Sequence, residues 1–404
     1  MDTDKRTSYI IIFSLWLLVF AASSQVMIIS PILPRISEQL STPESELGFL
    51  VTSYAVMLGI FAIIIGPVSD RVGRRKILLY GTSGMAVSLL LHGLVYDFWS
   101  LLLVRALSGM AGGVLSGVAV AYVGDYFPYE KRGWANGWIM SGIAMGQILG
   151  IPLGTVLAGS FGYKIPFMAF GVLMAMAFFL VLSSVPQPNV KLRKNRMSAI
   201  DAMHEYYGLL KRPDVKAVSF CYSLMFFSIS LFIVYLPAWL ENTFSVDGNA
   251  IATLFLVGGI ANVISGPQAG KLSDKLGRRN IIIFSCLGLF VLMLATTHIM
   301  TSFWVAYPLF FFSMVLIAMR ISPFQALSSE LVTADKRGSL MCLLVAIGQI
   351  GNGLGSAFAG SLYEVQGYDS NTYLAAFTIL LMAFVVWKFV PEPELKQDHV
   401  LEMS

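Results

Sequence analysis

The stretch GPVSDRVGRR, residues 66–75, returns 204 positions later as GKLSDKLGRR, residues 270–279. Six of the ten positions are identical in the two copies, and three of the other four exchange Val for Leu or Arg for Lys. Both copies are polar, within a chain of 404 residues that is 56% hydrophobic and only 12% charged. A polar sequence repeated at about half the chain length predicts two related halves.

The rest of the chain is too apolar for a soluble protein, because its mean hydropathy is +0.74. Apolar runs of about 20 residues, the length that crosses about 30 Å of hydrocarbon, recur along the sequence. Such segments must be helical, since lipid offers no partner for backbone polar groups. Twelve transmembrane helices are predicted, at about 8–30, 46–67, 77–96, 99–124, 134–158, 165–184, 217–240, 248–268, 280–298, 302–326, 338–361 and 371–390.

The basic residues predict the orientation of these spans, because positive charge gathers in cytoplasmic segments. With both termini in the cytoplasm, 23 of the 27 basic residues fall on that side, and the outer loops keep only Arg35 and Lys164. The remaining two, Arg105 and Arg320, lie within spans. The net charge of +4 therefore reflects membrane topology and not nucleic-acid binding. We expect a multi-pass protein of the cell membrane, the inner membrane if the source is bacterial.

Other pairs of similar segments, at nearly the same offset, also support two related halves. DYFPYEKRG (125–133) follows the fourth span and ELVTADKRG (330–338) follows the tenth. The predicted units are residues 1–184, a polar linker at 185–216 with a short amphipathic helix on the cytoplasmic membrane surface, and residues 217–404. Parallel halves of this kind surround a site near the membrane midplane and rock about it in alternating access.

The repeated loop resembles the signature of the major facilitator superfamily, G-x-x-x-D-R-x-G-R-R, which is matched by Gly66, Asp70, Arg71, Gly73, Arg74 and Arg75. RALSGMAGG (105–113) resembles the fourth-span signature of its drug:proton antiporters. GQILGIPLGT (146–155) resembles the fifth-span antiporter signature in the variant of sugar-efflux-type permeases. The resemblance covers the whole chain and implies an all-helical, twelve-span transporter.

The resemblance also implies a cytoplasmic charge cluster that latches the two halves in the outward-open state. The latch and coupling residues that it implies are Asp70, Arg71, Gly73, Arg74, Arg75, Arg105, Asp125, Asp274, Arg278 and Glu330. Among them, Arg105 belongs to the fourth-span signature, where it takes part in proton-linked conformational coupling. A plain topology anchor is the alternative for the loops. That alternative explains the arginines but neither the aspartates nor the glycines.

The fifth span carries Gly142, Gly146, Gly150 and Gly154 at intervals of four residues. This spacing predicts one smooth helix face that another backbone can approach. Pro152 adds a bend. Packing alone is a sufficient interpretation of the glycines, while the family resemblance makes this helix part of the gating seam, and both can hold.

In the family, spans 1, 4, 7 and 10 line the central cavity, so the resemblance makes their side chains candidate substrate contacts. The first span offers Phe20, Ser24 and Gln25, and the seventh offers Tyr222 and Phe226. Aromatic stripes at helical spacing are more often core than site. Gln25 and Tyr222 are the stronger candidates, because polar groups at this depth need partners.

Arg320 is the candidate that no family motif explains. It lies ten residues before Glu330, which places it about 15 Å into the helix at 1.5 Å per residue. A charge at that depth is costly and normally faces a cavity or a partner. We interpret Arg320 as a substrate contact; the alternative is a hydrogen bond to helix carbonyls, Gln349 or Asn352.

None of the 23 acidic residues lies in the middle of a predicted span. A cavity with arginines and no carboxylate favours an anionic or neutral polar ligand over a lipophilic cation. The same absence leaves few proton carriers, so a coupled proton would use Asp125, Glu330 or the substrate itself. Cys221, Cys286 and Cys342 fall within spans, and neither a disulfide framework nor a metal site is predicted.

We therefore predict a monomeric secondary active exporter that moves a small organic solute by alternating access, proton-linked and without a cofactor, and in contact with membrane lipid. The alternatives are an importer of the same fold, a broad multidrug exporter, and a lipid flippase-like protein. An enzyme is disfavoured, because no nucleophile–base pair or metal-ligand cluster occurs within the spans. Neither the identity of the substrate nor the direction of transport follows from the sequence, since specificity resides in the cavity and not in the fold.

Overall fold

The structure, a computed structural model, describes residues 2–188, 199–333 and 336–392. Within these ranges, the side chains of residues 2–6, 66, 67, 70, 71, 129, 130 and 199–203 are not described. The predicted latch residues Asp70 and Arg71 therefore lie outside the described side chains.

The chain is helical throughout its described part. The first half contains α1 (Asp2–Met27), α2 (Ile29–Leu40), α3 (Glu44–Val72), α4 (Arg74–Leu91), the 3₁₀ turn η1 (His92–Leu94), α5 (Phe98–Leu115), α6 (Val118–Tyr126), α7 (Tyr129–Met145), the π-helical turn η2 (Gly146–Gly150), α8 (Ile151–Phe161) and α9 (Lys164–Ser184). The second contains α11 (Pro213–Ile233), α12 (Leu236–Phe244), α13 (Gly248–Leu276), α14 (Arg278–Ile299), α15 (Phe303–Glu330), α16 (Arg337–Gln366) and α17 (Tyr368–Phe389). Between them lies α10 (Ala199–Lys211).

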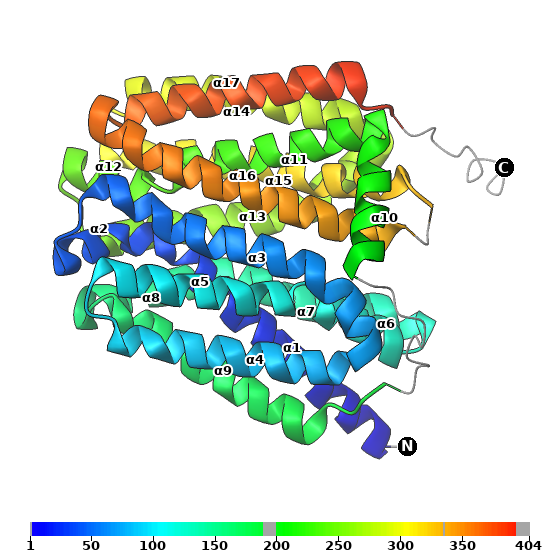
Figure 1. Ribbon diagram of the computed structural model, residues 1–404. Helices are drawn as coiled ribbons and strands as arrows, with labels where there is room; N and C mark the ends of the chain where they lie inside the picture. The colour runs from blue at the N-terminus through cyan, green and yellow to red at the C-terminus, as the bar shows by residue number, and fades with distance from the viewer. Residues whose placement is uncertain (1, 189–198, 334–335, 393–404) are drawn as a thin grey trace.

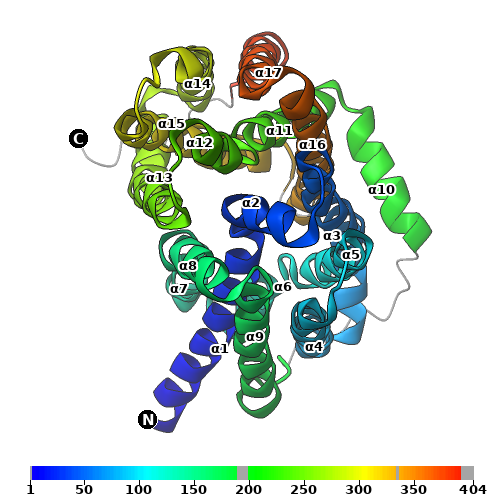
Figure 2. The same cartoon turned by 90° about the vertical axis from the view of Figure 1, so that its left-hand side faces the viewer.

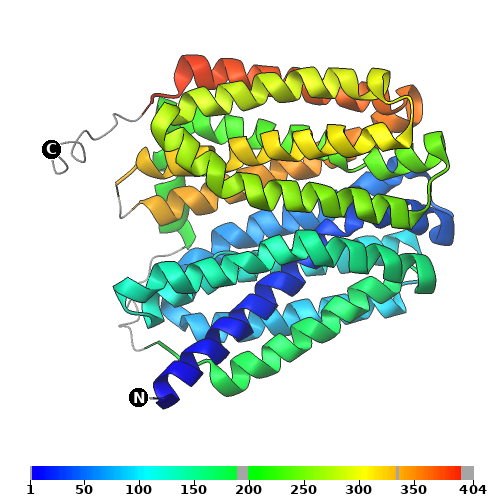
Figure 3. The same cartoon turned by 180° about the vertical axis from the view of Figure 1, so that it is seen from behind.

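Twelve helical segments of the described chain are long and apolar enough to cross a membrane, one for each predicted span. They form two bundles, α1–α9 and α11–α17, which lie one above the other in Figure 1 and again, from behind, in Figure 3. The start of α1 and the end of α17 lie at the same end of the molecule as the repeated loops. The positive charge of these loops makes this end cytoplasmic.

The two halves meet along two seams. Helix α3 packs on α16, and α8 packs on α13, so the seams lie on opposite sides of the centre when the molecule is viewed from its outer end (Figure 2). Helices α2 and α12, the outer extensions of the first and seventh spans, also pack against each other. The centre of the molecule is therefore enclosed by both halves at the outer end.

Several spans that we expected to be continuous are interrupted, the first of them at Ile28 between α1 and α2. The fourth span breaks between α5 and α6, where Gly117 adopts a φ of +73° that favours glycine. The seventh breaks at Tyr235, two residues before Pro237, whose missing N–H cannot continue the helical ladder. The π-helical turn η2 precedes Pro152, which accounts for the predicted bend in the fifth span.

Helix α10 lies across the cytoplasmic ends of both halves (Figure 1). Tyr206 is buried, and its hydroxyl donates to the carbonyl of Ile63 in α3 at 3.3 Å. Burial raises the pKa of Tyr206 to about 12, so the hydroxyl keeps its proton at neutral pH. A helix therefore occupies the predicted linker, and it contacts α3 of one half and α11 and α16 of the other. Its placement on the membrane surface stays a prediction.

Candidate functional site

A cavity of about 190 Å³ lies between the two halves. Polar side chains from five spans line it: Ser30, Gln147, Ser230, Asn262 and Asn352. The remaining wall is apolar or glycine, with side chains such as those of Phe255, Phe310 and Met314. An apolar enclosure with a few convergent polar groups is the usual form of a small-molecule site.

The polar groups of this cavity are neutral. No ionisable side chain is among its described lining residues. The amide side chains of Gln147, Asn262 and Asn352 make no hydrogen bond that the structure describes, which leaves their donors and acceptors free for a ligand.

Tyr235 closes this cavity toward the outside. Its hydroxyl donates to the carbonyl of Glu44 at 2.6 Å and accepts the N–H of Gly48 at 2.9 Å, so the second half binds the backbone of the first. Its ring stacks on Tyr363, with the ring centroids 5.2 Å apart. Asn242 adds a hydrogen bond to Glu44 at 3.4 Å. These contacts form an outer seal, defined here as Tyr235 and Asn242 on Glu44 and Gly48.

The outer seal separates two hollows. A wider one of about 570 Å³ opens on the outer face and is lined by Glu44, Tyr363 and neighbouring residues. The inner cavity begins at Val51 on α3 and Val234 on the seventh span, just inside Gly48 and Tyr235. A solute in the inner cavity would have to pass the seal to reach the outside.

Two glycines let α3 and α16 approach closely enough to make this seal. A Cβ on Gly48 would lie 2.1 Å from the carbonyl oxygen of Ser356, and a Cβ on Gly360 would lie 2.3 Å from that of Ser45. Farther inward, Thr52 donates to the carbonyl of Gly353 at 2.6 Å. Any side chain at Gly48 or Gly360 would force the two halves apart.

Arg105 is buried inside the first half and has partners there. Its Nη1 donates to Gln25 Oε1 at 3.0 Å, and its guanidinium lies 4.6 Å from the ring centroid of Tyr54. Gln25 Nε2 in turn donates to the Tyr54 hydroxyl at 3.1 Å. The predicted substrate candidate Gln25 therefore holds the predicted coupling residue Arg105.

Arg320 is buried inside the second half but, unlike Arg105, makes no described hydrogen bond. It is 0% exposed, and Nε, Nη1 and Nη2 each lack a hydrogen-bond partner among the described residues. The alternative bonds to helix carbonyls, Gln349 or Asn352 are thus not made here. Most buried polar groups are hydrogen-bonded, so an unpaired guanidinium calls for an explanation.

The other predicted substrate contacts lie near the cavity but do not line it. Tyr222 stands 5.3 Å from Phe226 and 5.9 Å from Phe324, measured between ring centroids, in the core of the second half. Phe20 stacks on Trp16 in the first half at 5.4 Å. The contact of these side chains with substrate remains a prediction.

The glycine face of the fifth span packs directly on the first span. Added Cβ atoms on Gly146, Gly150 and Gly154 would meet side-chain atoms of α1 or Ile28 at 2.6 Å or less. Ser24, another predicted substrate candidate, is the neighbour of Gly150 and lies in this seam. The close approach predicted from the four-residue spacing is therefore confirmed, while its gating role stays a prediction.

At the cytoplasmic end of the first half, Arg74 joins three helices. Its Nε donates to Asp125 Oδ2 at 2.8 Å and its Nη1 donates to Ser69 Oγ at 2.7 Å. Gly73 begins α4 with a φ of +96°, which explains the glycine of the motif. The ion pair of Arg74 with Asp125 lies within one half.

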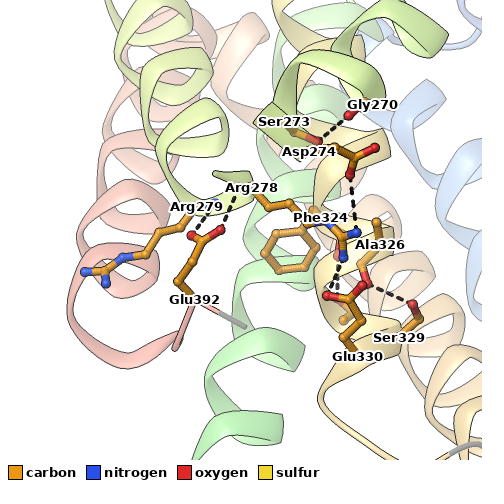
Figure 4. Close-up of polar contacts among 11 residues, drawn as sticks. Gly270, Ser273, Asp274, Arg278, Arg279, Phe324, Ala326, Ser329, Glu330 and Glu392 are labelled. Carbon is orange, nitrogen blue, oxygen red and sulfur yellow. Dashed lines mark hydrogen bonds and ion pairs between the residues drawn. The ribbon is translucent and has the colours of Figure 1, made fainter. Parts of the chain in front are cut away.

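The second half contains a corresponding cluster around Arg278 (Figure 4). Arg278 forms ion pairs with Glu330 at 2.5 Å and with Asp274 at 3.3 Å. Both partners belong to the same half as Arg278. In this conformation, the described ion pairs of the two loops thus stabilise each half internally.

The last arginine of each loop binds the end of a different helix, which the sequence analysis missed. Arg75 donates to the carbonyls of Val185, just after α9, and of Leu182, in its last turn, at 2.6 and 2.7 Å. Arg279 donates in the same way to the carbonyl of Trp387 in α17. Leu182 and Trp387 are 205 positions apart, so the arrangement is duplicated.

In each half, a side chain that follows α9 or α17 also caps the start of another helix, α4 in the first half and α14 in the second. Gln187 Oε1 accepts the N–H of Arg75 at 3.3 Å. Glu392 accepts the N–H groups of Arg278 and Arg279 at 2.7 and 2.8 Å (Figure 4). The signal was present in the sequence, as VPQP at 185–188 and VPEP at 390–393.

Two six-helix bundles around an enclosed, neutral cavity define a membrane transporter of the alternating-access class. Residues 15–216 and 218–403 match the sequence model of the Major Facilitator Superfamily. The chain therefore belongs to this family, whose members carry small molecules and are not enzymes.

Several relatives and solved structures share its full length. The chain is 26% identical to the multidrug resistance protein MdtG of Proteus mirabilis (strain HI4320), over 97% of this chain and 98% of the relative. It is also 26% identical to YwfA, an uncharacterized transporter of Bacillus subtilis (strain 168), over 100% and 98%. The crystal structure of a D-xylose–proton symporter superposes with a TM-score of 0.79 at 21% identity, covering 96% of this chain and 99% of that one. The similarity to this symporter concerns the fold alone.

Proposed function

We propose that the protein is a proton-linked exporter of a small organic solute, with a preference for anionic or neutral polar substrates. The observation that carries this proposal is the inner cavity, which both halves enclose and which the outer seal closes. A solute bound there can leave to the outside only when Tyr235 releases Glu44 and Gly48. That release is the outward half of an alternating-access cycle.

The chemistry of the cavity supports the substrate preference. Its described lining carries no carboxylate that could pair with an organic cation. Each half also buries one cation, Arg105 in the first and Arg320 in the second. Gln25, Phe20, Ser24, Tyr222 and Phe226 complete the proposed set of substrate contacts around the cavity.

Proton coupling is proposed for the cytoplasmic charge clusters. Asp125 and Glu330 are partly exposed carboxylates whose arginine partners start α4 and α14. Protonation of either carboxylate would weaken its ion pair and free the loop. The latch and coupling role of these clusters, and of the Gln25–Arg105 pair, is part of the proposal.

Export is favoured over import by the multidrug resistance name of a full-length relative. The same name keeps a broad multidrug exporter as the second candidate. An importer and a lipid flippase-like protein remain outcomes of the test below.

Proteoliposomes with an acidic interior and a lumenal pH dye provide that test. We expect externally added anionic or neutral polar solutes to raise the lumenal pH, because each solute entering expels protons. Asp125→Asn should abolish this response, while Asp369→Asn, an exposed outer position, should retain it. A response to lipophilic cations alone would identify a multidrug exporter, and solute uptake together with protons would identify an importer. Redistribution of a fluorescent lipid without solute dependence would identify a flippase.

A further inference from the structure

The starting observation is the contrast between the two buried arginines. Arg105 has Gln25 and the Tyr54 ring as partners, whereas all three side-chain nitrogens of Arg320 lack a hydrogen bond among the described residues. A buried cation without a partner is strongly destabilising. Arg105 already has partners in its own half. Arg320 is therefore the arginine with which a bound anion would pair.

Among the described residues, no carboxylate pairs with Arg320. Phe324 follows one helical turn later and contacts Tyr222. The described titratable group that acts on Arg320 is the thiol of Cys286. The described ion pairs of this half belong to Arg212 and Arg278 at its cytoplasmic end. The missing negative charge must therefore come from a molecule that enters the bundle.

The position of Arg320 on α15 relates it to the inner cavity. Phe310 and Met314 on the same helix line that cavity. Arg320 lies six residues beyond Met314, about 9 Å nearer the cytoplasmic end, and about 80° around the helix from Phe310. From this flank a long arginine side chain can turn toward the space between the halves.

The inner cavity, on the outer side of Arg320, is lined by uncharged hydrogen-bonding groups. Gln147, Asn262 and Asn352 come from three different spans and have free amide groups facing the cavity. A volume of about 190 Å³ accommodates only a small group, of the size of a substituted ring. The cavity therefore fits the uncharged end of a larger molecule.

We infer that the substrate is an amphiphilic organic anion that occupies two subsites at once. Its uncharged, hydrogen-bonding end lies in the inner cavity against Gln147, Asn262 and Asn352. Its carboxylate or other anionic group binds Arg320, about 9 Å nearer the cytoplasm along the helix axis. This inference deepens the proposed function, because it names the substrate class and the residues that select it.

The test uses three probes that share a 4-acetamidophenyl body and end in propanoate, propanamide or propylammonium. Binding is measured by thermal stabilisation of the purified full-length protein, since a ligand of the folded state raises the melting temperature with its concentration. We expect propanoate to bind more tightly than propanamide, and propylammonium not to bind. Arg320→Met should weaken propanoate about tenfold or more and leave propanamide unchanged, because only the charge-assisted bonds are lost. Asn262→Leu should weaken both probes.

A second readout separates ligand binding from a structural role of Arg320. Arg320→Met should raise the melting temperature of the ligand-free protein, because it removes an unpaired buried charge. Arg105→Met should lower it, because Gln25 loses its partner. Propanoate binding that is equal in the wild type and in Arg320→Met would overturn the inference, and so would a fall in the melting temperature of ligand-free Arg320→Met. If the wild type binds propanoate through Arg320 but shows no proton-coupled flux, the proposed exporter is contradicted and the Arg320 subsite is still supported.

Discussion

The hydroxyl of Tyr235 lies 2.6 Å from the carbonyl oxygen of Glu44, so a single side chain of the second half holds the backbone of the first. The same oxygen accepts the N–H of Gly48 at 2.9 Å. Because Tyr235 stands at the break between α11 and α12, the seal is attached to a point where the helix can pivot. Opening to the outside requires both bonds to break together.

Replacing Tyr235 by Phe should shift the protein toward its outward-open state. The variant loses two hydrogen bonds between the halves, worth about 2 kcal/mol in total, and keeps the ring that stacks on Tyr363. A cysteine introduced at Ser30, in the inner cavity, should then react faster with a membrane-impermeant maleimide added from outside. Tyr373→Phe is the matched control, since its hydroxyl contacts only His298 of the same half. Equal labelling rates in the two variants would contradict the role of Tyr235.

Adding a methyl group at Gly48 should open the same side by steric force. An alanine Cβ would lie 2.1 Å from the carbonyl oxygen of Ser356, and α3 would have to move away from α16. We expect Gly48→Ala to increase outside labelling of the Ser30 cysteine and to slow transport. Gly353→Ala on the same seam is the control, because its Cβ would meet Thr52 at an ordinary 3.4 Å. A Gly48→Ala protein that transports like Gly353→Ala would show that this approach is not needed.

Replacing Gln25 by Leu should destabilise the first half. Arg105 Nη1 would lose its acceptor inside the bundle, at a cost of about 1–3 kcal/mol for an unsatisfied buried group. The melting temperature of the purified protein measures this loss. Gln25→Glu retains an oxygen acceptor beside Arg105, so its stability should stay at or above that of the wild type. The reverse order of the two variants would contradict the assigned pairing.

The fold was predictable from three features: the duplicated loop indicated two related halves, the apolar runs gave the number of spans, and the basic residues gave their direction. The smooth glycine face of the fifth span also followed from sequence, because it depends on local spacing. The cavity amides Gln147 and Asn262 did not. A polar residue in an apolar helix can face a cavity or a neighbour, and only the rotation of each helix in its bundle decides which.

The breaks at Gly117 and Tyr235 were missed for a related reason. Hydropathy averages over a whole span and is the same for a straight and an interrupted helix. The isolation of Arg320 is equally invisible in sequence, since it is defined by the absence of partners from neighbouring helices. The caps at Gln187 and Glu392 were predictable, because VPQP and VPEP repeat at an offset of 205 residues.

The two caps make a prediction that compares the halves directly. The carboxyl group of Glu392 accepts two N–H groups at the start of α14, where the helix dipole favours an acidic side chain. The amide of Gln187 accepts one N–H at the start of α4. Glu392→Gln should therefore lower the free energy of unfolding by about 1 kcal/mol, and Gln187→Glu should raise it by about 0.5 kcal/mol. Melting temperatures at low salt measure both changes, and the double exchange should fall between them. Stabilisation by Glu392→Gln, or destabilisation by Gln187→Glu, would mean that the loop–helix junction is governed by Arg75 and Arg279 alone.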